Sequence, residues 1–80
     1  MKIRVVEVYN GGDREVDVNT TTLDWPELTV KAVKQYLINQ FEVEEEEGAN
    51  INEMFAFQKK GPVIVANATD DFQVFMFTPC

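Results

Sequence analysis

Residues 30–41, which read VKAVKQYLINQF, decide the predicted fold. Their large apolar side chains recur at steps of three and four, whereas lysine, glutamine and asparagine fall on the other side. This period predicts an amphipathic helix that ends near Phe41. We expect the helix to pack across a sheet through one apolar stripe, made of Val30, Val33, Leu37 and Phe41.

The segment just before this stretch carries start signals for a helix. Asp24 and Glu27 have the spacing of a capping box, and Pro26 suits a first helical turn. We therefore expect the helix to begin at these residues or within four positions of them. We expect Trp25 to pack over the edge of the core, and the alternative role is a ligand platform.

The N-terminal region is typical of a β-hairpin. Residues 2–9 (KIRVVEVY) are rich in valine, isoleucine and tyrosine, and residues 10–13 (NGGD) give a tight-turn signal. Residues 14–18 (REVDV) alternate polar residues with valine, which predicts a strand with one wet face. Because Val8 lies on the opposite parity to Val5, we expect it to be exposed or to follow a bulge.

Three further strands are expected after the helix, at residues 54–58 (MFAFQ), 63–65 (VIV) and 72–77 (FQVFMF). The last of them is apolar on both parities, which suits a central strand that a helix covers on one face. If the helix covers Val74, the rings of Phe75 and Phe77 share the uncovered face and can anchor a partner or a second copy of the chain. The alternative is that a longer loop packs these rings into the core.

The order strand, strand, helix, strand, strand, strand predicts an α+β fold with one helix packed on a mixed sheet of four to five strands. Residues 1–5 (MKIRV) alternate as a first strand, residues 30–32 (VKA) open the helix, and residues 55–59 (FAFQK) give a third strand followed by a basic residue. In these places the chain resembles the ubiquitin-like β-grasp family. The resemblance implies a single β-grasp domain over residues 1–80.

The resemblance also implies an apolar docking patch drawn from the first hairpin, the third strand and the last strand. The positions similar to that patch are Val8, Ala56 and either Phe75 or Phe77. Modifiers of the ubiquitin type end in a Gly-Gly carboxylate, whereas residues 78–80 read TPC. We therefore expect a binding module and not a conjugated modifier.

Composition argues against several classes of function. A formal net charge of −7 opposes direct contact with a nucleic-acid backbone. The chain has no histidine and a single cysteine, Cys80, so the usual general base, the commonest zinc ligand and a disulfide are missing. We expect no enzymatic activity, no cofactor and no metal. The N-terminal residues lack the apolar run of a signal peptide or a membrane span, so we expect a cytoplasmic protein.

Acidic residues are concentrated after the predicted helix. Six of the fourteen lie between residues 42 and 53, and four are consecutive: Glu44, Glu45, Glu46 and Glu47. This density favours a partner protein with a basic surface. The alternative is a solvated loop that only keeps a small domain in solution.

These features predict a small acidic, non-enzymatic protein–protein interaction module. Its expected partner-binding residues are Val8, Ala56, Phe75, Phe77, Glu44, Glu45, Glu46 and Glu47. The alternative is an inhibitor, such as a phage or mobile-element product, whose acidic surface blocks a nucleic-acid-binding host or defence protein. Binding through carboxylates weakens steeply with ionic strength and aromatic anchoring does not, so salt dependence separates the two hypotheses.

Overall fold

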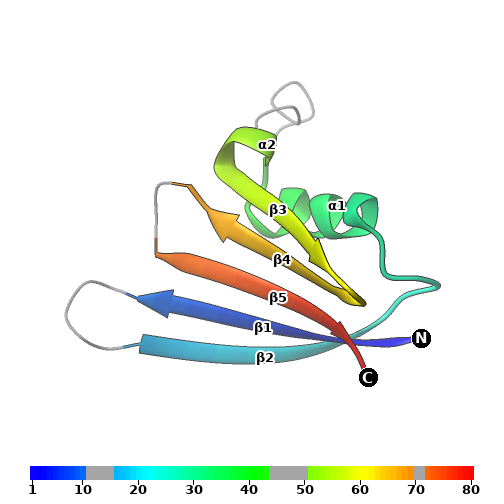
Figure 1. Ribbon diagram of the computed structural model, residues 1–80. Helices are drawn as coiled ribbons and strands as arrows, with labels where there is room; N and C mark the ends of the chain where they lie inside the picture. The colour runs from blue at the N-terminus through cyan, green and yellow to red at the C-terminus, as the bar shows by residue number, and fades with distance from the viewer. Residues whose placement is uncertain (11–15, 44–50, 70–71) are drawn as a thin grey trace.

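The computed structural model describes residues 1–10, 16–43, 51–69 and 72–80. A five-stranded sheet and a helix packed on one of its faces make up the architecture (Figure 1). The strands are β1 (Lys2–Asn10), β2 (Val16–Asp24), β3 (Phe55–Lys60), β4 (Val63–Ala68) and β5 (Gln73–Pro79). The helices α1 (Val30–Gln40) and α2 (Ile51–Met54) lie between β2 and β3 in the chain.

The strand directions correct the predicted topology. The order across the sheet is β2-β1-β5-β4-β3, and every neighbouring pair is antiparallel. The segment with α1 and α2 carries the chain from β2 at one edge to β3 at the other, and the meander β3-β4-β5 then fills the sheet inward. This meander sets the direction of β5, which runs antiparallel to β1. The predicted mixed sheet is therefore wrong for the described strands, whereas the predicted α+β class, with a five-stranded sheet packed on a helix, is confirmed.

Helix α1 begins within the predicted interval but uses a different cap. Thr29 is the N-cap, and its hydroxyl oxygen accepts a hydrogen bond from the backbone N–H of Ala32 at 3.1 Å. Asp24 ends β2 instead, and its carboxylate lies 3.3 Å from the N-terminal ammonium of Met1. The predicted helix end is confirmed, because Phe41 is the C-cap.

The core lies between α1 and one face of the sheet. Its buried residues are Ile3, Val5, Val33, Leu37, Ile51, Phe55, Ile64, Ala66, Phe75 and Phe77. Phe75 and Phe77 are 2% and 0% exposed, so the expectation of uncovered rings is wrong. The rings are in the core, as the alternative had it, but they pack with Val33 and Leu37 of α1 and not under a longer loop. The reason is that α1 covers the face of β5 that carries Phe75 and not the face that carries Val74.

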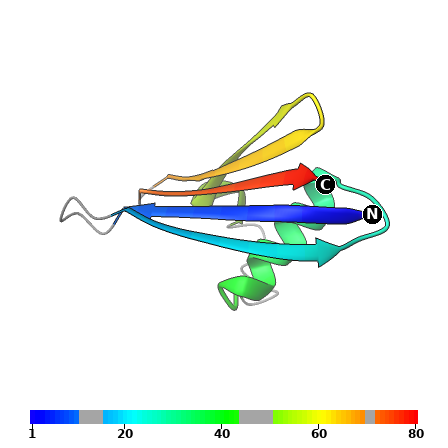
Figure 2. The same ribbon diagram turned by 90° about the horizontal axis from the view of Figure 1, so that it is seen from below.

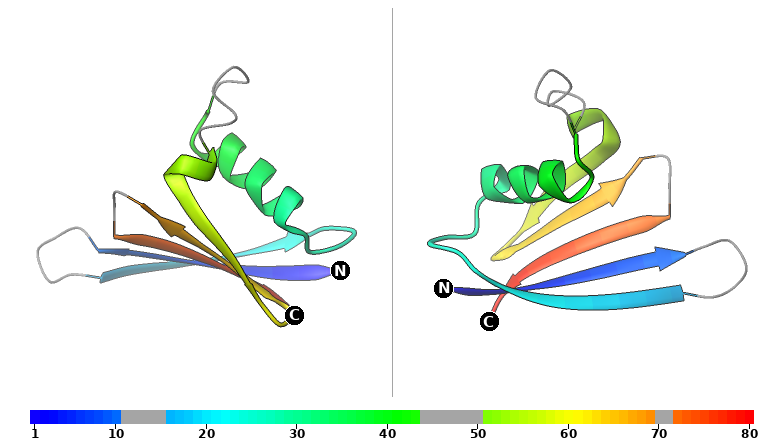
Figure 3. Two further views of the ribbon diagram at one scale, coloured as in Figure 1. Left: turned by 45° about the horizontal axis from the view of Figure 1, so that its top comes forward. Right: turned by 180° about the vertical axis from the view of Figure 1, so that it is seen from behind.

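Both helices lie on the same side of the sheet, as the views in Figures 2 and 3 show. The single turn of α2 was not predicted; it buries Ile51 just before β3. Strand β2 is also longer than predicted, because residues 20–22 (TTT) continue its pairing with β1. Neither described helix combines the length and the apolar content needed to cross a lipid bilayer.

Candidate functional site

The sheet face opposite the helices carries a continuous apolar surface. Successive side chains of a strand point to opposite faces, so the neighbours of the buried residues lie on this side. One row across the sheet joins Val6 to Met76 and Met76 to Val65, and the next joins Val18 to Val8 and Val8 to Val74. We call this surface the open sheet face; its apolar residues are Val6, Val8, Val16, Val18, Val63, Val65, Val74 and Met76.

These side chains are exposed or half-buried. Strands spaced about 4.8 Å apart and residues spaced about 3.3 Å apart give the apolar part of the face an area of roughly 400 Å². The largest apolar patch on a monomeric protein measures about 300–600 Å², and such patches are often functional. The open sheet face therefore falls within the size range of the largest apolar patch on a monomer and is a candidate docking surface.

The charges on this face are opposite in sign to the charge of the whole chain. Strand alternation puts Lys2, Arg4 and Lys60 at one end of the face. Among the described strand residues, Asp24 is the one acidic residue at this end, opposite Lys2. Its charge is already paired with the N-terminal ammonium of Met1. The open sheet face thus combines an apolar centre with a basic end, although the chain carries a net charge of −7.

The structure brings two of the predicted partner-binding residues to this face. Val8 lies opposite Val74, Val74 opposite Asn67, and Asn67 opposite Ala56, so Val8 and Ala56 belong to one row that spans four strands. The predicted acidic residues, Glu44 to Glu47, lie outside the described residues.

The predicted partner-binding residues did not include Phe72, the most exposed of the described large apolar residues. Its side chain is 78% exposed, and its carbonyl oxygen accepts a hydrogen bond from the N–H of Asn10 at 2.9 Å. Phe72 therefore lies beside Asn10, the last residue of β1, which follows Val8 by two positions. The signal that could have found it is its parity, which it shares with Val74 and Met76.

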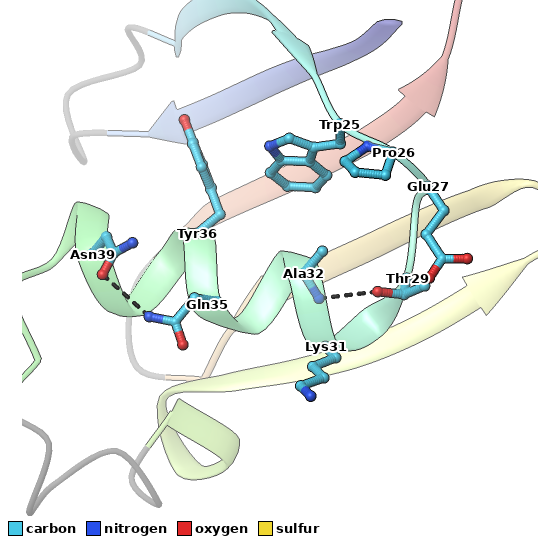
Figure 4. Close-up of a pocket in the computed structure, with 9 residues that line it drawn as sticks. All are labelled: Trp25, Pro26, Glu27, Thr29, Lys31, Ala32, Gln35, Tyr36 and Asn39. Atoms are coloured by element: carbon cyan, nitrogen blue, oxygen red, sulfur yellow. Dashed lines mark hydrogen bonds between the residues drawn. The ribbon is translucent and has the colours of Figure 1, made fainter. Parts of the chain in front are cut away.

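An open depression on the helix side is lined by the Trp25 and Tyr36 rings and by one side of α1 from Lys31 to Asn39 (Figure 4). The Trp25 ring lies against Tyr36 at 5.9 Å and against Phe77 at 6.0 Å between ring centroids. On the rim, the side-chain amide of Gln35 donates to the side-chain oxygen of Asn39 at 3.2 Å. The predicted packing of Trp25 over the core edge is confirmed, and the ring contacts give this site a structural role.

Comparison with known proteins adds no assignment, because no family model, curated protein or solved structure matches the chain. The functional argument therefore depends on the geometry and the charge of the surfaces described above.

Proposed function

We propose that this domain is a non-enzymatic protein-binding module that docks through the open sheet face. The observation that supports the proposal is the apolar row across β2, β1, β5 and β4, which no described element covers. Burying roughly 400 Å² of apolar surface corresponds to about 10 kcal/mol of transfer free energy, part of which is offset by the loss of rigid-body freedom on association.

The charge pattern selects the kind of partner. The partner that fits best has an apolar surface with acidic groups at one rim, opposite Lys2, Arg4 and Lys60. Complementary rim charges of this kind steer association. A second copy fits less well, since each chain carries −7 and face-to-face packing brings two such charges together. The overall charge predicted a basic partner, whereas the open sheet face itself fits an acidic one.

Two pairs of variants test this proposal on any protein that the wild-type domain binds. Val8→Thr with Val74→Thr keeps the shape and strand preference of both residues and removes apolar contact. We expect it to weaken binding about tenfold or more with little change in stability. Lys60→Glu should slow association, and Lys59→Glu is its matched control, because Lys59 is the neighbouring residue on the other face of β3.

A partner that binds the threonine double variant as tightly as the wild type would overturn the proposal. Replacing Glu44 to Glu47 with glutamine tests the inhibitor alternative in the same assay. If this change abolishes binding and the open-face variants do not, the acidic run is the docking surface and the open sheet face is not. Measurement at low and high salt adds a second criterion, because apolar docking should weaken little as ionic strength rises.

A further inference from the structure

Glu7 is a half-buried carboxylate on the face of β1 that is turned toward the helices. Ile3 and Val5 precede it at the same parity and are buried, and Phe75 lies directly opposite it in β5. The side-chain amide of Gln73 donates to Glu7 Oε1 at 3.3 Å, and none of the described cations forms an ion pair with Glu7. Tyr9, the next residue on this face, is 41% exposed, so Glu7 lies where the core-facing row of β1 reaches solvent.

A pocket of about 450 Å³ lies beside Glu7, between the second half of α1 and the strands β1 and β2. Val5 and Phe75 provide apolar lining. The other lining residues offer oxygen atoms, and none of them is basic: Glu7, Asn19, Thr20, Thr21, Tyr36 and Gln40. Figure 4 shows the Tyr36 side chain extending from α1 toward β1, with the hydroxyl at its far end.

Two sources of negative potential meet at this pocket. One is the Glu7 carboxylate. Burial is the larger cause of the raised pKa of Tyr36, and the charge of Glu7 is the smaller cause. The other is the C-terminal end of α1, where Gln40 is the last helical residue and the last turn contains no basic side chain. A helix C-terminus favours cations, and here the helix itself supplies none.

We propose that this pocket binds a cationic group, an ammonium or a guanidinium, with Glu7 as its counter-charge. The Tyr36 hydroxyl and the Gln40 amide oxygen accept further hydrogen bonds, and Val5 and Phe75, each 2% exposed, form the inner wall of the pocket. The group comes from a small amine or guanidine, or from a lysine or arginine side chain of a protein. The site is on the helix side of the sheet, so it is independent of the open sheet face.

Methylguanidinium and the peptide acetyl-Gly-Arg-Gly-amide are the probes, and acetyl-Gly-Gln-Gly-amide is the uncharged control. In a Tyr9→Phe background Tyr36 is the one remaining tyrosine. We expect the charged probes to shift the backbone amide signals of Asn19, Thr21 and Gln40 and to lower the pKa of Tyr36. Equal affinity for both charged probes identifies a small-cation site, and tighter binding of the peptide identifies a site for a basic side chain.

Glu7→Gln should weaken binding of the charged probes about tenfold or more, because a charge-assisted contact is lost. Glu53→Gln makes the same charge change at an exposed position outside the pocket and should leave the affinity within about twofold. Should Glu7→Gln unfold the domain, Gln40→Leu at the exposed helix end gives a second test and should also weaken binding. Binding of the glutamine peptide as tightly as the arginine peptide, or unchanged affinity in the Gln40 variant and in a folded Glu7 variant, would overturn the proposal.

Discussion

The indole ring of Trp25 stacks on Phe77, with ring centroids 6.0 Å apart and ring planes 20° apart. Tyr36 meets both rings nearly edge-on. Trp25 belongs to the connection between β2 and α1, Phe77 to the central strand β5, and Tyr36 to α1. This aromatic cluster therefore fixes the start of the helix over the middle of the sheet.

Trp25→Ala should lower the free energy of unfolding by about 2–4 kcal/mol, because it removes the ring contacts with Tyr36 and Phe77 and leaves a cavity beside Phe77. Trp25→Phe keeps a ring in place and should cost less. Urea denaturation followed by circular dichroism measures both. An alanine variant as stable as the wild type would show that the cluster contributes nothing to stability.

Leu37→Ala should cost about 2–5 kcal/mol, because Leu37 is completely buried between α1 and the sheet. Gln35→Ala is the control on the same helix, since Gln35 is exposed and alanine is a good helix former. Thermal and urea unfolding of both variants check the prediction. Equal losses for the two would contradict the assignment of the buried helix face.

Tyr36 gives the domain a pH dependence at high pH. Burial, and then the charge of Glu7, raise the pKa of Tyr36 above its usual value of about 10. Its contribution to stability is fully present below pH 10 and is lost as the pH rises through the folded-state pKa, because the folded state holds the proton more tightly. Glu7→Gln should lower this pKa but leave it above the usual value, since burial is the larger cause. Ultraviolet absorbance titration in the Tyr9→Phe background measures the shift, and an unchanged pKa would contradict the coupling to Glu7.

Phe72→Ala should separate binding from folding. The ring is 78% exposed, so we expect the free energy of unfolding to change by less than about 0.5 kcal/mol. Because exposed aromatic side chains beside an apolar patch often act as binding anchors, we expect weaker binding of a partner to the open sheet face. Unfolding and binding measurements on one preparation test both parts, and a large loss of stability would mean that the ring serves the fold.

Cys80→Ser should leave both stability and partner binding unchanged. The thiol is exposed, and no described histidine or disulfide partner acts on it. Thermal unfolding under reducing and non-reducing conditions checks this prediction. A lower midpoint in the serine variant would assign a structural role to the thiol.

The sequence predicted those parts of the fold in which the spacing of apolar residues is compatible with one kind of secondary structure and one buried face. Val33 and Leu37 share a period that only a helix satisfies, and they are the two buried residues of α1. Ile3 and Val5 alternate with charged neighbours, so their burial on one face also follows from the sequence. In both elements the apolar pattern marks a single face.

The remaining features depend on contacts between elements distant in the chain. Strand β5 is apolar on both parities, so nothing local decides whether Val74 or Phe75 faces α1. Thr29 and Asp24 are both good N-cap residues, and the difference is that β2 continues as far as Asp24. The Glu7 pocket could not be predicted, because α1 brings Tyr36 and Gln40 over β1 and β2 only in the folded chain.

Strand β5 occupies the middle of the sheet, although it follows every other strand in the chain. The hairpins β1-β2 and β3-β4 pair locally, but each keeps one edge open until β5 inserts between them and places Phe77 beside Val5 and Ile64. Pairing β1 with β5 brings together residues that are more than 60 positions apart in the chain. The entropy cost of closing such a long loop makes this a slow step of folding. A ribosome releases β5 after both hairpins, so we expect the sheet to remain incomplete until β5 has left the ribosome.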